Sequence, residues 1–326
     1  MRAVRIVPEG DDGRLEVVDM DSPRARADEV VVEVAAGGVN RADTIQRRGR
    51  YAPPPGASPI PGLECSGTVI AVGAEVTSWN IGDEVCALLA GGGYAEQVAV
   101  PADQVLAAPA GMPLVDAAAL PEAMATAWSN LVGMGRLRAG ERVLVHGGSS
   151  GVGTMAIQIA RMLGAEVFVT VGSPDKEAAC RALGAAEVIN YRTEDFVERV
   201  HHLTGGTGVD VVLDLVGAAY ARRNVDALAV EGRLVIIGLQ SGSLAEVELR
   251  QVLLKRVVIT GSLLRSRTVR QKAAVLRELE RSVLPHVESG QIRPVIDSVL
   301  TLDRASEAHA IIESSRHIGK ILLTPR

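Results

Sequence analysis

A glycine-rich turn at residues 147–153 carries the clearest chemical implication in this sequence. It lies in VLVHGGSSGVGTMAIQIA, where an apolar run at 142–146 meets the turn and an amphipathic helix follows to about Gly164. Glycines allow a tight turn and close approach to a ligand, and a helix start offers unpaired N–H groups and the positive end of its dipole. The pattern predicts a pocket for the pyrophosphate of a dinucleotide, with contacts from Ser149, Ser150, Gly151 and Val152.

The end of the second predicted strand bears on which dinucleotide fits. In dinucleotide folds an acidic side chain about 20 residues beyond the turn binds the ribose 2′-hydroxyl and favours NAD. Here strand 166–171 is followed by Gly172-Ser173-Pro174-Asp175-Lys176, with no carboxylate at the strand tip. Ser173 and Lys176 suit a 2′-phosphate, whereas an inward-facing Asp175 would repel one. The same residues also match ordinary helix capping, and the two roles are compatible.

The elements that must position this turn alternate regularly from about Glu122. Six strands with intervening helices predict a doubly wound parallel sheet. The strands are expected at 142–146, 166–171, 187–190, 209–214, 232–237 and 256–261, and the helices at 151–163, 174–183, 194–203 and 220–229.

Residues 1–120 show a different pattern, with short alternating strands interrupted by Gly and Pro. A Pro-rich loop occupies residues 51–62, and the segment after 265 does not continue the alternation. We expect that last segment to rejoin the first domain. The predicted fold is therefore α/β, with a β-rich domain of residues 1–122 and 266–326 and a dinucleotide-binding domain of residues 123–265. The individual elements are strands at 3–7, 29–35, 67–72, 83–88, 94–100, 295–300 and 318–323, and helices at 40–47, 268–289 and 303–313.

Composition narrows the classes of function. A net charge of −5 gives no general attraction to nucleic acid or anionic membranes. No apolar run approaches the roughly 18 residues of a membrane helix, and the first residues have too short an apolar core for a signal peptide. Cys65, Cys86 and Cys180 lie far apart without a CxxC pair, which disfavours a disulfide framework. We expect a cytoplasmic protein whose cores consist of Ala, Val, Leu and Ile, since only 2% of the residues are aromatic.

Several stretches together resemble the medium-chain dehydrogenase/reductase superfamily: AAGGVNRADTIQRRGRYAPPPG (35–56), PIPGLECSGTVIAVG (59–73), IGDEV (81–85) and GGGYAEQVAVP (93–101). Further stretches narrow the resemblance to its zinc-independent quinone oxidoreductase, or zeta-crystallin-like, branch, and most to the tumour-suppressor-inducible NADPH:quinone oxidoreductases: LPEAMATAW (120–128), VHGGSSGVGTMAIQ (145–158), GSLLRSR (261–267) and HIGKILL (317–323). The resemblance implies a GroES-like catalytic domain, a Rossmann domain and an active site in the cleft between them. It also places Ser173 and Lys176 at the 2′-phosphate, which makes NADPH the predicted cofactor.

The resemblance also indicates whether this chain has the residues to bind a zinc ion. Zinc alcohol dehydrogenases of this superfamily carry a Cys and a His at positions that correspond here to Asn40 and Leu63. Neither suits zinc, which prefers thiolate and imidazole ligands, and the six His are scattered along the chain. We predict no metal, and hence an acceptor that is already electron-poor.

Asn40 and Tyr51 are the predicted catalytic residues. Asn40 could bond the nicotinamide ribose or the substrate carbonyl, and it also suits a helix N-cap. Relatives place a tyrosine matching Tyr51 beside the nicotinamide, where it could stack, donate a hydrogen bond or pass a proton. The remaining predicted cofactor contacts are Thr126, Tyr191, Gly238, Leu239, Ser262, Leu263, Leu264 and Lys320. An alternative interpretation of Tyr191 is an ordinary partly buried side chain without a cofactor contact. The alternative interpretation of Lys320 is a solvated lysine.

The predicted reaction is hydride transfer from C4 of NADPH to a quinone or a similar conjugated acceptor. The alternatives are an NADPH-dependent enone or enoyl-thioester reductase and a non-catalytic NADPH-binding crystallin-like protein. The basic run 265–272 is interpreted as a charged turn and helix start rather than an RNA site, so no nucleic-acid partner is expected. A homodimer is expected through the apolar strand Arg256–Thr260, because unpaired strand edges tend to be covered.

Overall fold

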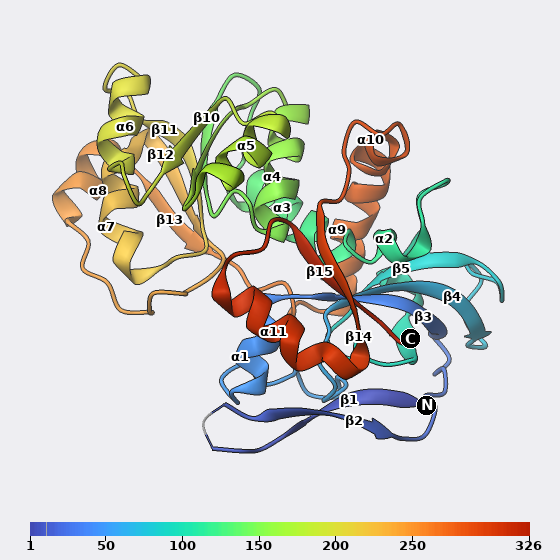
Figure 1. Cartoon of the computed structure of the whole chain (residues 1–326). Coiled ribbons are helices and arrows are strands. Elements are labelled where there is room, and N and C mark those ends of the chain that lie inside the picture. Colours follow the sequence, from blue (N-terminus) through green and yellow to red (C-terminus); the bar gives the residue numbers. More distant parts are fainter. Residues whose placement is uncertain (11) are drawn as a thin grey trace. The chain divides into compact units, whose positions relative to one another are not determined.

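The computed structural model describes residues 1–10 and 12–326 and divides the chain into two compact units (Figure 1). The first unit combines Met1–Ala125 with Leu264–Arg326, and the second is Thr126–Leu263. The junctions predicted from the sequence followed residues 122 and 265. The first junction falls inside one helix, α3 (Pro121–Trp128).

The second unit is built on a six-stranded sheet whose neighbouring strands all pair in parallel. Its strand order is β10-β9-β8-β11-β12-β13, which is typical of the doubly wound sheet predicted from the sequence. These strands read as apolar runs because parallel strands are buried on both faces. The strands are β8 (Arg142–His146), β9 (Glu166–Val171), β10 (Glu187–Asn190), β11 (Val209–Asp214), β12 (Leu228–Ile236) and β13 (Val258–Gly261).

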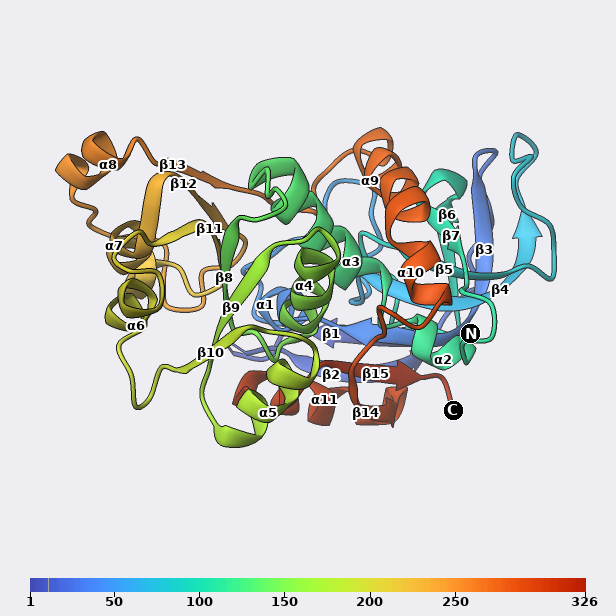
Figure 2. The same ribbon diagram turned by 90° about the horizontal axis from the view of Figure 1, so that it is seen from above.

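Helices cover both faces of this sheet (Figures 1 and 2). The pair α4 (Gly151–Met162) and α5 (Pro174–Ala182) lies on one side, and α6 (Phe196–Leu203) and α7 (Ala218–Ala227) lie on the other. One helix, α8 (Leu249–Lys255), was not predicted, and it carries several exposed leucines. A π-helical segment, Ser129–Met134, follows α3.

The first unit is organised around a long strand, β3 (Glu29–Val39), which pairs with β15, β4 and β6. The C-terminal segment joins this sheet, since Ile321 of β15 pairs with Val39 of β3, as the sequence predicted. A hairpin of β1 (Arg2–Val7) and β2 (Arg14–Asp19) stands beside it, and β2 was missed from the sequence. The other strands are β4 (Glu64–Val72), β5 (Glu84–Leu88), β6 (Gln97–Pro101), β7 (Val105–Ala107), β14 (Ile296–Thr301) and β15 (Lys320–Thr324).

The helices of the first unit depart from the prediction at two points, since α2 (Leu114–Ala117) was not predicted and one predicted helix is divided. The single helix expected at 268–289 is two helices, α9 (Val269–Ser282) and α10 (Leu284–Glu288). Pro285 explains the break, because proline has no N–H to donate to the carbonyl oxygen of Arg281 and its ring clashes with that carbonyl in a continuous helix. The remaining helices are α1 (Arg41–Arg47), α2 (Leu114–Ala117), α11 (Ala305–Ser314) and two short 3₁₀ turns, Ala102–Gln104 and Leu302–Arg304.

The cores have the composition that the low aromatic content predicts. One core cluster of the first unit is dominated by valines, among them Val30, Val32, Val69 and Val85. All three cysteines are free and buried. Within the described residues, no helix combines the length and the apolar character needed to span a membrane.

Candidate functional site

The glycine-rich turn leads from β8 into α4 in the predicted way. Ser150 is the N-cap residue, and its Oγ accepts a hydrogen bond from Gly153 N at 3.0 Å. The first helical hydrogen bond runs from Thr154 N to Ser150 O at 2.8 Å. The N–H groups of Gly151 and Val152 come before that bond, so they are the donors that the helix start offers to a ligand.

The glycines of the turn are required by close packing. A Cβ on Gly153 would lie 2.3 Å from the carbonyl oxygen of Gly147, and one on Gly148 would lie 2.6 Å from Cβ of Val169. Real Cβ atoms do not approach that closely, so only glycine permits this backbone path.

A buried polar network lies behind the turn. Nδ1 of His146 is 2.9 Å from Oγ1 of Thr170, and its Nε2 is 2.7 Å from Oδ1 of Asn224. Burial lowers the pKa of His146 to about 4, so the ring is neutral at physiological pH. Thr170 also accepts a hydrogen bond from Gly148 N through its carbonyl oxygen, at 3.1 Å. His146 therefore ties β8 to β9 and α7 at the point where the turn begins.

The tip of β9 is shaped by Gly172. A Cβ there would lie 2.5 Å from the Tyr191 hydroxyl, so the glycine allows Tyr191 to pack across the strand end while remaining 46% exposed. Ser173 is the N-cap residue of α5 with Pro174 in the first turn, yet its side chain makes no capping hydrogen bond within the described residues. Lys176 is half-buried and Asp175 is exposed.

Further predicted contacts follow β12 and β13. Oγ of Ser262 donates to Oδ1 of Asn130 at 2.7 Å, and Nδ2 of Asn130 donates to Thr126 O at 2.8 Å. These bonds connect two of the predicted contact residues through the π-helical segment. The other predicted residues differ in exposure: Leu239 and Leu263 are 55% and 56% exposed, Gly238 packs against Leu215, and Leu264 is buried at 6%.

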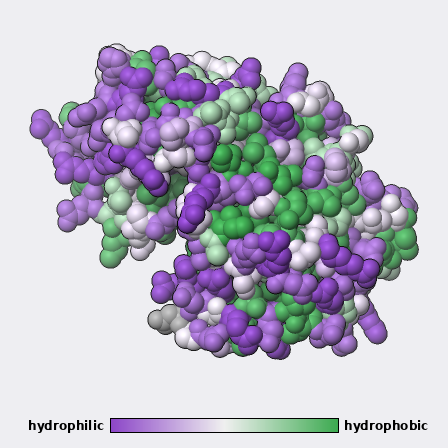
Figure 3. Space-filling view, viewed as in Figure 1, coloured by the Kyte–Doolittle hydropathy of each residue, from purple (hydrophilic) through white to green (hydrophobic). Residues whose placement is uncertain are grey.

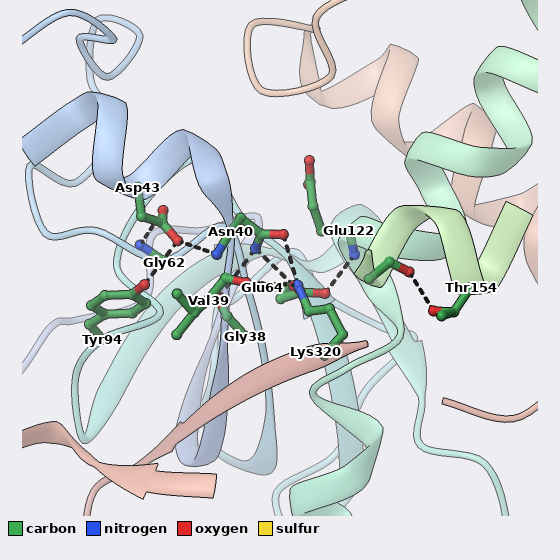
Figure 4. Close-up of polar contacts among 11 residues, drawn as sticks. Gly38, Val39, Asn40, Asp43, Gly62, Glu64, Tyr94, Glu122, Thr154 and Lys320 are labelled. Carbon is green, nitrogen blue, oxygen red and sulfur yellow. Dashed lines mark hydrogen bonds and ion pairs between the residues drawn. The ribbon is translucent and has the colours of Figure 1, made fainter. Parts of the chain in front are cut away.

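In the first unit, Lys320 forms a buried ion pair with Glu64 (Figure 4). Nζ of Lys320 lies 2.5 Å from Oε1 of Glu64, 2.8 Å from Oδ1 of Asn40 and 3.2 Å from the carbonyl oxygen of Val39. An ammonium has three donors, so these three acceptors use all of them. The interpretation of Lys320 as a solvated lysine is therefore wrong, because it is 5% exposed and fully engaged.

Asn40 is held by the same ion pair. Besides accepting from Lys320, its Nδ2 donates to Oε1 of Glu64 at 2.9 Å and to the carbonyl oxygen of Gly38 at 3.3 Å. It precedes α1 as the N-cap residue, and its backbone N–H donates to Oδ2 of Asp43 at 2.8 Å. The capping role considered from the sequence is therefore present.

The same geometry does not fit a zinc ion. The ammonium of Lys320 lies where it would repel a cation bound by Asn40, and Leu63 offers no ligand atom. Over residues 1–10 and 12–326, no group of three or more His, Cys, Asp or Glu side chains is placed to hold a metal.

A second buried chain of polar groups lies beside α1. The Tyr94 hydroxyl donates to Oδ2 of Asp43 at 3.0 Å and is 3.2 Å from Nε2 of His309. Burial raises the pKa of Asp43 to about 6 and lowers that of His309 to about 3. This chain fixes α1, and with it Asn40, against α11.

Tyr51 is half-buried at the start of the Pro-rich loop, and Arg265 contacts it. The Arg265 guanidinium lies 5.1 Å from the centre of the Tyr51 ring, and its Nη1 donates to Tyr51 O at 3.2 Å. Arg265 is 3% exposed and Lys272 is 2% exposed. The run 265–272 forms the turn and helix start predicted from the sequence, but burial of these two basic residues was not predicted.

Sequence reasoning missed four residues that shape the site: Gln46, Glu64, Glu122 and Arg265. Glu64 accepts from the backbone N–H of Glu122 at 2.8 Å. Burial, and then the Glu64 charge, raise the pKa of Glu122 to about 8. One available signal was Glu64 itself, a lone charge in the apolar run LECSG, because an isolated carboxylate in such a run requires a buried partner.

Comparisons with known proteins agree with this geometry. "Alcohol dehydrogenase GroES-like domain" matches residues 26–110, and "Zinc-binding dehydrogenase" matches residues 151–281. The rat quinone oxidoreductase is 33% identical over 99% of this chain and 97% of its own length. The chain belongs to the quinone oxidoreductase family of medium-chain dehydrogenases/reductases. It is also 33% identical to a phenolphthiocerol/phthiocerol polyketide synthase of Mycobacterium tuberculosis over 95% of this chain, but it spans only 14% of that protein's length.

Solved structures confirm the predicted combination of a GroES-like and a Rossmann fold. The Escherichia coli quinone oxidoreductase complexed with NADPH has a TM-score of 0.87 and 33% identity, with 99% of both chains covered. A structure described as an NAD-dependent alcohol dehydrogenase has a TM-score of 0.89 and 34% identity over all of both chains. The JamJ enoyl reductase has a TM-score of 0.88 and 28% identity, covering 99% of this chain and 98% of its own. The solved structures similar to this chain are thus named for different substrates and cofactors.

Proposed function

We propose that this protein is an NADPH-dependent reductase of quinones or similar electron-poor conjugated acceptors. The observation that carries the proposal is the glycine cradle at the start of α4, combined with a strand tip on β9 that has no carboxylate. The Escherichia coli quinone oxidoreductase, whose structure is a complex with NADPH, supports the same cofactor.

The cofactor proposal assigns a role to each part of the second unit. The N–H groups of Gly151 and Val152 and the adjacent Ser150 would hold the pyrophosphate, whereas the burial of Ser149, which is 4% exposed, disfavours a direct contact. The Ser173 hydroxyl, which makes no capping bond, and the Lys176 side chain would hold the 2′-phosphate, and the exposed ring of Tyr191 would lie against the adenosine. Thr126, Gly238, Leu239, Ser262 and Leu263 remain the proposed contacts toward the nicotinamide half, whereas the burial of Leu264 disfavours a direct contact.

When bound, NADPH supplies a hydride from C4 of its nicotinamide ring. Because Asn40 and Lys320 form no Lewis-acid site, the acceptor must be polarised by its own conjugation and by hydrogen bonds from the protein. Burial raises the pKa of Tyr51, so its phenol stays protonated at neutral pH and can donate to the acceptor oxygen. The longest Asn40 contact, 3.3 Å to Gly38 O, is the one that a ligand would replace.

Lys320 has no role as a direct cofactor ligand in this proposal, because its donors are used within the first unit. It acts instead by holding Asn40 and Glu64 in place. This assignment replaces the cofactor contact predicted from the sequence.

A steady-state assay tests the proposal. NADPH and NADH are compared with 9,10-phenanthrenequinone, 1,4-benzoquinone, simple enones and crotonyl-CoA as acceptors. We expect turnover of the quinones with a clear preference for NADPH. Faster turnover of the enones or of crotonyl-CoA would replace the proposal with the enoyl reductase alternative, which the likeness to JamJ favours. Tight NADPH binding without turnover of any acceptor would support the non-catalytic alternative.

We further propose a homodimer joined along β13. Val258 and Ile259 of this edge strand are 52% and 43% exposed, and Leu253 of the neighbouring α8 is 77% exposed. Apolar surface appears among hydrophilic residues on the side of the second unit where α8 lies (Figure 3). A cytoplasmic location is part of the same proposal, because the three free, buried cysteines suit a reducing compartment.

A further inference from the structure

Arg265 joins three separate segments of the first unit. Its Nε donates to Ala90 O at 2.8 Å, its Nη1 to Tyr51 O at 3.2 Å, and its Nη2 to Oε1 of Gln46 at 2.8 Å. Gln46 in turn donates from Nε2 to Pro59 O at 2.9 Å. The two side chains therefore hold the Pro-rich loop at both ends, and they are bonded to each other.

The environment of Arg265 is unusual for a buried cation. The three hydrogen-bond acceptors given above are two backbone carbonyls and a neutral amide, and none is a carboxylate. Burial of a guanidinium is costly and lowers the pKa of Arg265, although the charges of Asp43, Tyr51 and Glu122 act in the opposite direction. The aromatic face nearest to this charge belongs to Tyr51, with its ring centre 5.1 Å from the guanidinium carbon. A cation at this distance from a ring is attracted by its electron-rich face.

We propose that Arg265 is a positioning residue that fixes Tyr51 and makes its phenol a stronger hydrogen-bond donor to the acceptor. The guanidinium holds the backbone of Tyr51 through the hydrogen bond from Nη1 to the Tyr51 carbonyl oxygen. Its positive charge lies near the Tyr51 ring, which carries the hydroxyl. A positive charge beside a phenol favours the partial negative charge that develops on the oxygen when it donates. This inference rests on the proposed function in its reference to the acceptor, whereas the relation between Arg265 and Tyr51 stands without it.

Lysine cannot replace Arg265 in this arrangement. An ammonium keeps the charge but has no planar fork with which to reach Ala90, Tyr51 and Gln46 together. Arg265→Lys therefore keeps the positive charge but loses the three-way hydrogen bonding, and Arg265→Gln removes the charge. Gln46→Ala removes the second anchor of the loop and one of the three acceptors of Arg265, while the guanidinium itself is kept.

The test is a double-mutant cycle with Tyr51→Phe, using 9,10-phenanthrenequinone at saturating NADPH. We expect Arg265→Gln to lower kcat about 5- to 30-fold with little change in KM for NADPH. Arg265→Lys should lie between this variant and the wild type. In the Tyr51→Phe background, Arg265→Gln should lower kcat less than about twofold. Arg304→Gln, an exposed arginine of the same unit, is the matched control and should leave kcat unchanged.

An equal loss of kcat in both backgrounds would overturn the proposal, because Arg265 would then act independently of Tyr51. If the Arg265 variants do not fold, the same cycle is run with Gln46→Ala, and the same two outcomes decide it. A second readout does not require turnover: the phenol of Tyr51 is titrated by its ultraviolet absorbance. The Tyr51 signal is the difference between each protein and the same protein carrying Tyr51→Phe. Loss of the Arg265 charge should raise the pKa of Tyr51, and an unchanged pKa would count against the proposal. If the wild type reduces no acceptor, the proposed function fails while this titration still decides the role of Arg265.

Discussion

Nζ of Lys320 lies 2.5 Å from Oε1 of Glu64, and the two side chains are 6% and 0% exposed. The pair brings β15, at the C-terminal end of the chain, to β4, with Asn40 bonded to both partners. A buried ion pair is weak evidence for net stabilisation, because both charges lose their hydration. Its clearest effect here is geometric: it fixes the amide of Asn40 and leaves no place for a metal cation.

Breaking this pair should destabilise the protein strongly. Lys320→Met leaves the Glu64 carboxylate buried without its counter-charge, which should lower the free energy of unfolding by about 3–5 kcal/mol. Lys320→Met combined with Glu64→Gln removes both charges and should be more stable than Lys320→Met alone. Urea unfolding of the three proteins measures the difference. A double variant as unstable as the single one would show that the loss arises from packing rather than from an unpaired charge.

Lys176→Ala should discriminate between the two nicotinamide cofactors. Loss of one charged contact to a phosphate costs about 1.5–3 kcal/mol, so KM for NADPH should rise about 10- to 100-fold while KM for NADH changes little. Arg181→Ala, an exposed residue of the same helix, is the control. Equal effects of Lys176→Ala on the two cofactors would remove Lys176 from the proposed phosphate site.

The glycine cradle gives a prediction about stability. A Cβ on Gly153 would lie 2.3 Å from Gly147 O and 2.7 Å from the carbonyl carbon of Gly148, both backbone atoms that cannot rotate away. Gly153→Ala should therefore destabilise the fold by about 1–3 kcal/mol and weaken NADPH binding. Gly133→Ala is the matched control, because its Cβ would meet no atom within 4 Å. Unfolding curves and fluorescence titration with NADPH measure the two effects, and a Gly153→Ala protein as stable as Gly133→Ala would contradict the packing argument.

The sequence was most informative where a local pattern decides local structure. The individual strands of the second unit, the turn from β8 into α4 and the proline in the first turn of α5 all follow from residue types within a few positions of one another. The break between α9 and α10 could also have been predicted, because Pro285 lies inside the helix expected at 268–289.

The contacts that the sequence could not predict join residues far apart in the chain. Lys320 and Glu64 are separated by 256 positions, and Arg265 and Gln46 by 219. No local pattern distinguishes a buried lysine or arginine from a solvated one, because the partner that permits burial is set by the tertiary fold. For that reason the basic run 265–272 was interpreted only as a charged turn and helix start, and the anchoring contacts of Arg265 were not predicted.

The exposed edge of the second sheet predicts self-association. Ile259→Lys places a charge on β13, which native proteins use to block pairing of strand edges. We expect the wild type to be a homodimer at micromolar concentration by light scattering and Ile259→Lys to be a monomer with unchanged circular dichroism. Glu198→Lys, on an exposed side chain of α6 in the same unit, is the control for added positive charge. A monomeric wild type would exclude the proposed interface.

Acid should destabilise the wild type partly through His309. Its pKa is lowered to about 3 by burial in the folded protein, whereas an unfolded histidine titrates near 6.5. Between these values the unfolded chain binds a proton that the folded protein does not, so this contribution to stability is present above about pH 6.5 and is lost as the pH falls toward 3. Asp43, whose pKa is raised to about 6, acts in the opposite sense, so the total pH dependence cannot isolate one group.

His309→Gln isolates the histidine, because the Gln side chain has polar atoms with which to meet the Tyr94 hydroxyl and does not titrate. Between pH 7 and pH 5 the wild type should lose about 2 kcal/mol of unfolding free energy relative to His309→Gln, since the unfolded His309 becomes protonated over that interval. Urea unfolding at both pH values measures the difference. His202→Gln, which changes an exposed histidine, is the matched control for the substitution itself. A wild type and a His309→Gln variant that respond equally to pH would mean that His309 is protonated in the folded state, and therefore that the buried contact with Tyr94 does not hold it neutral.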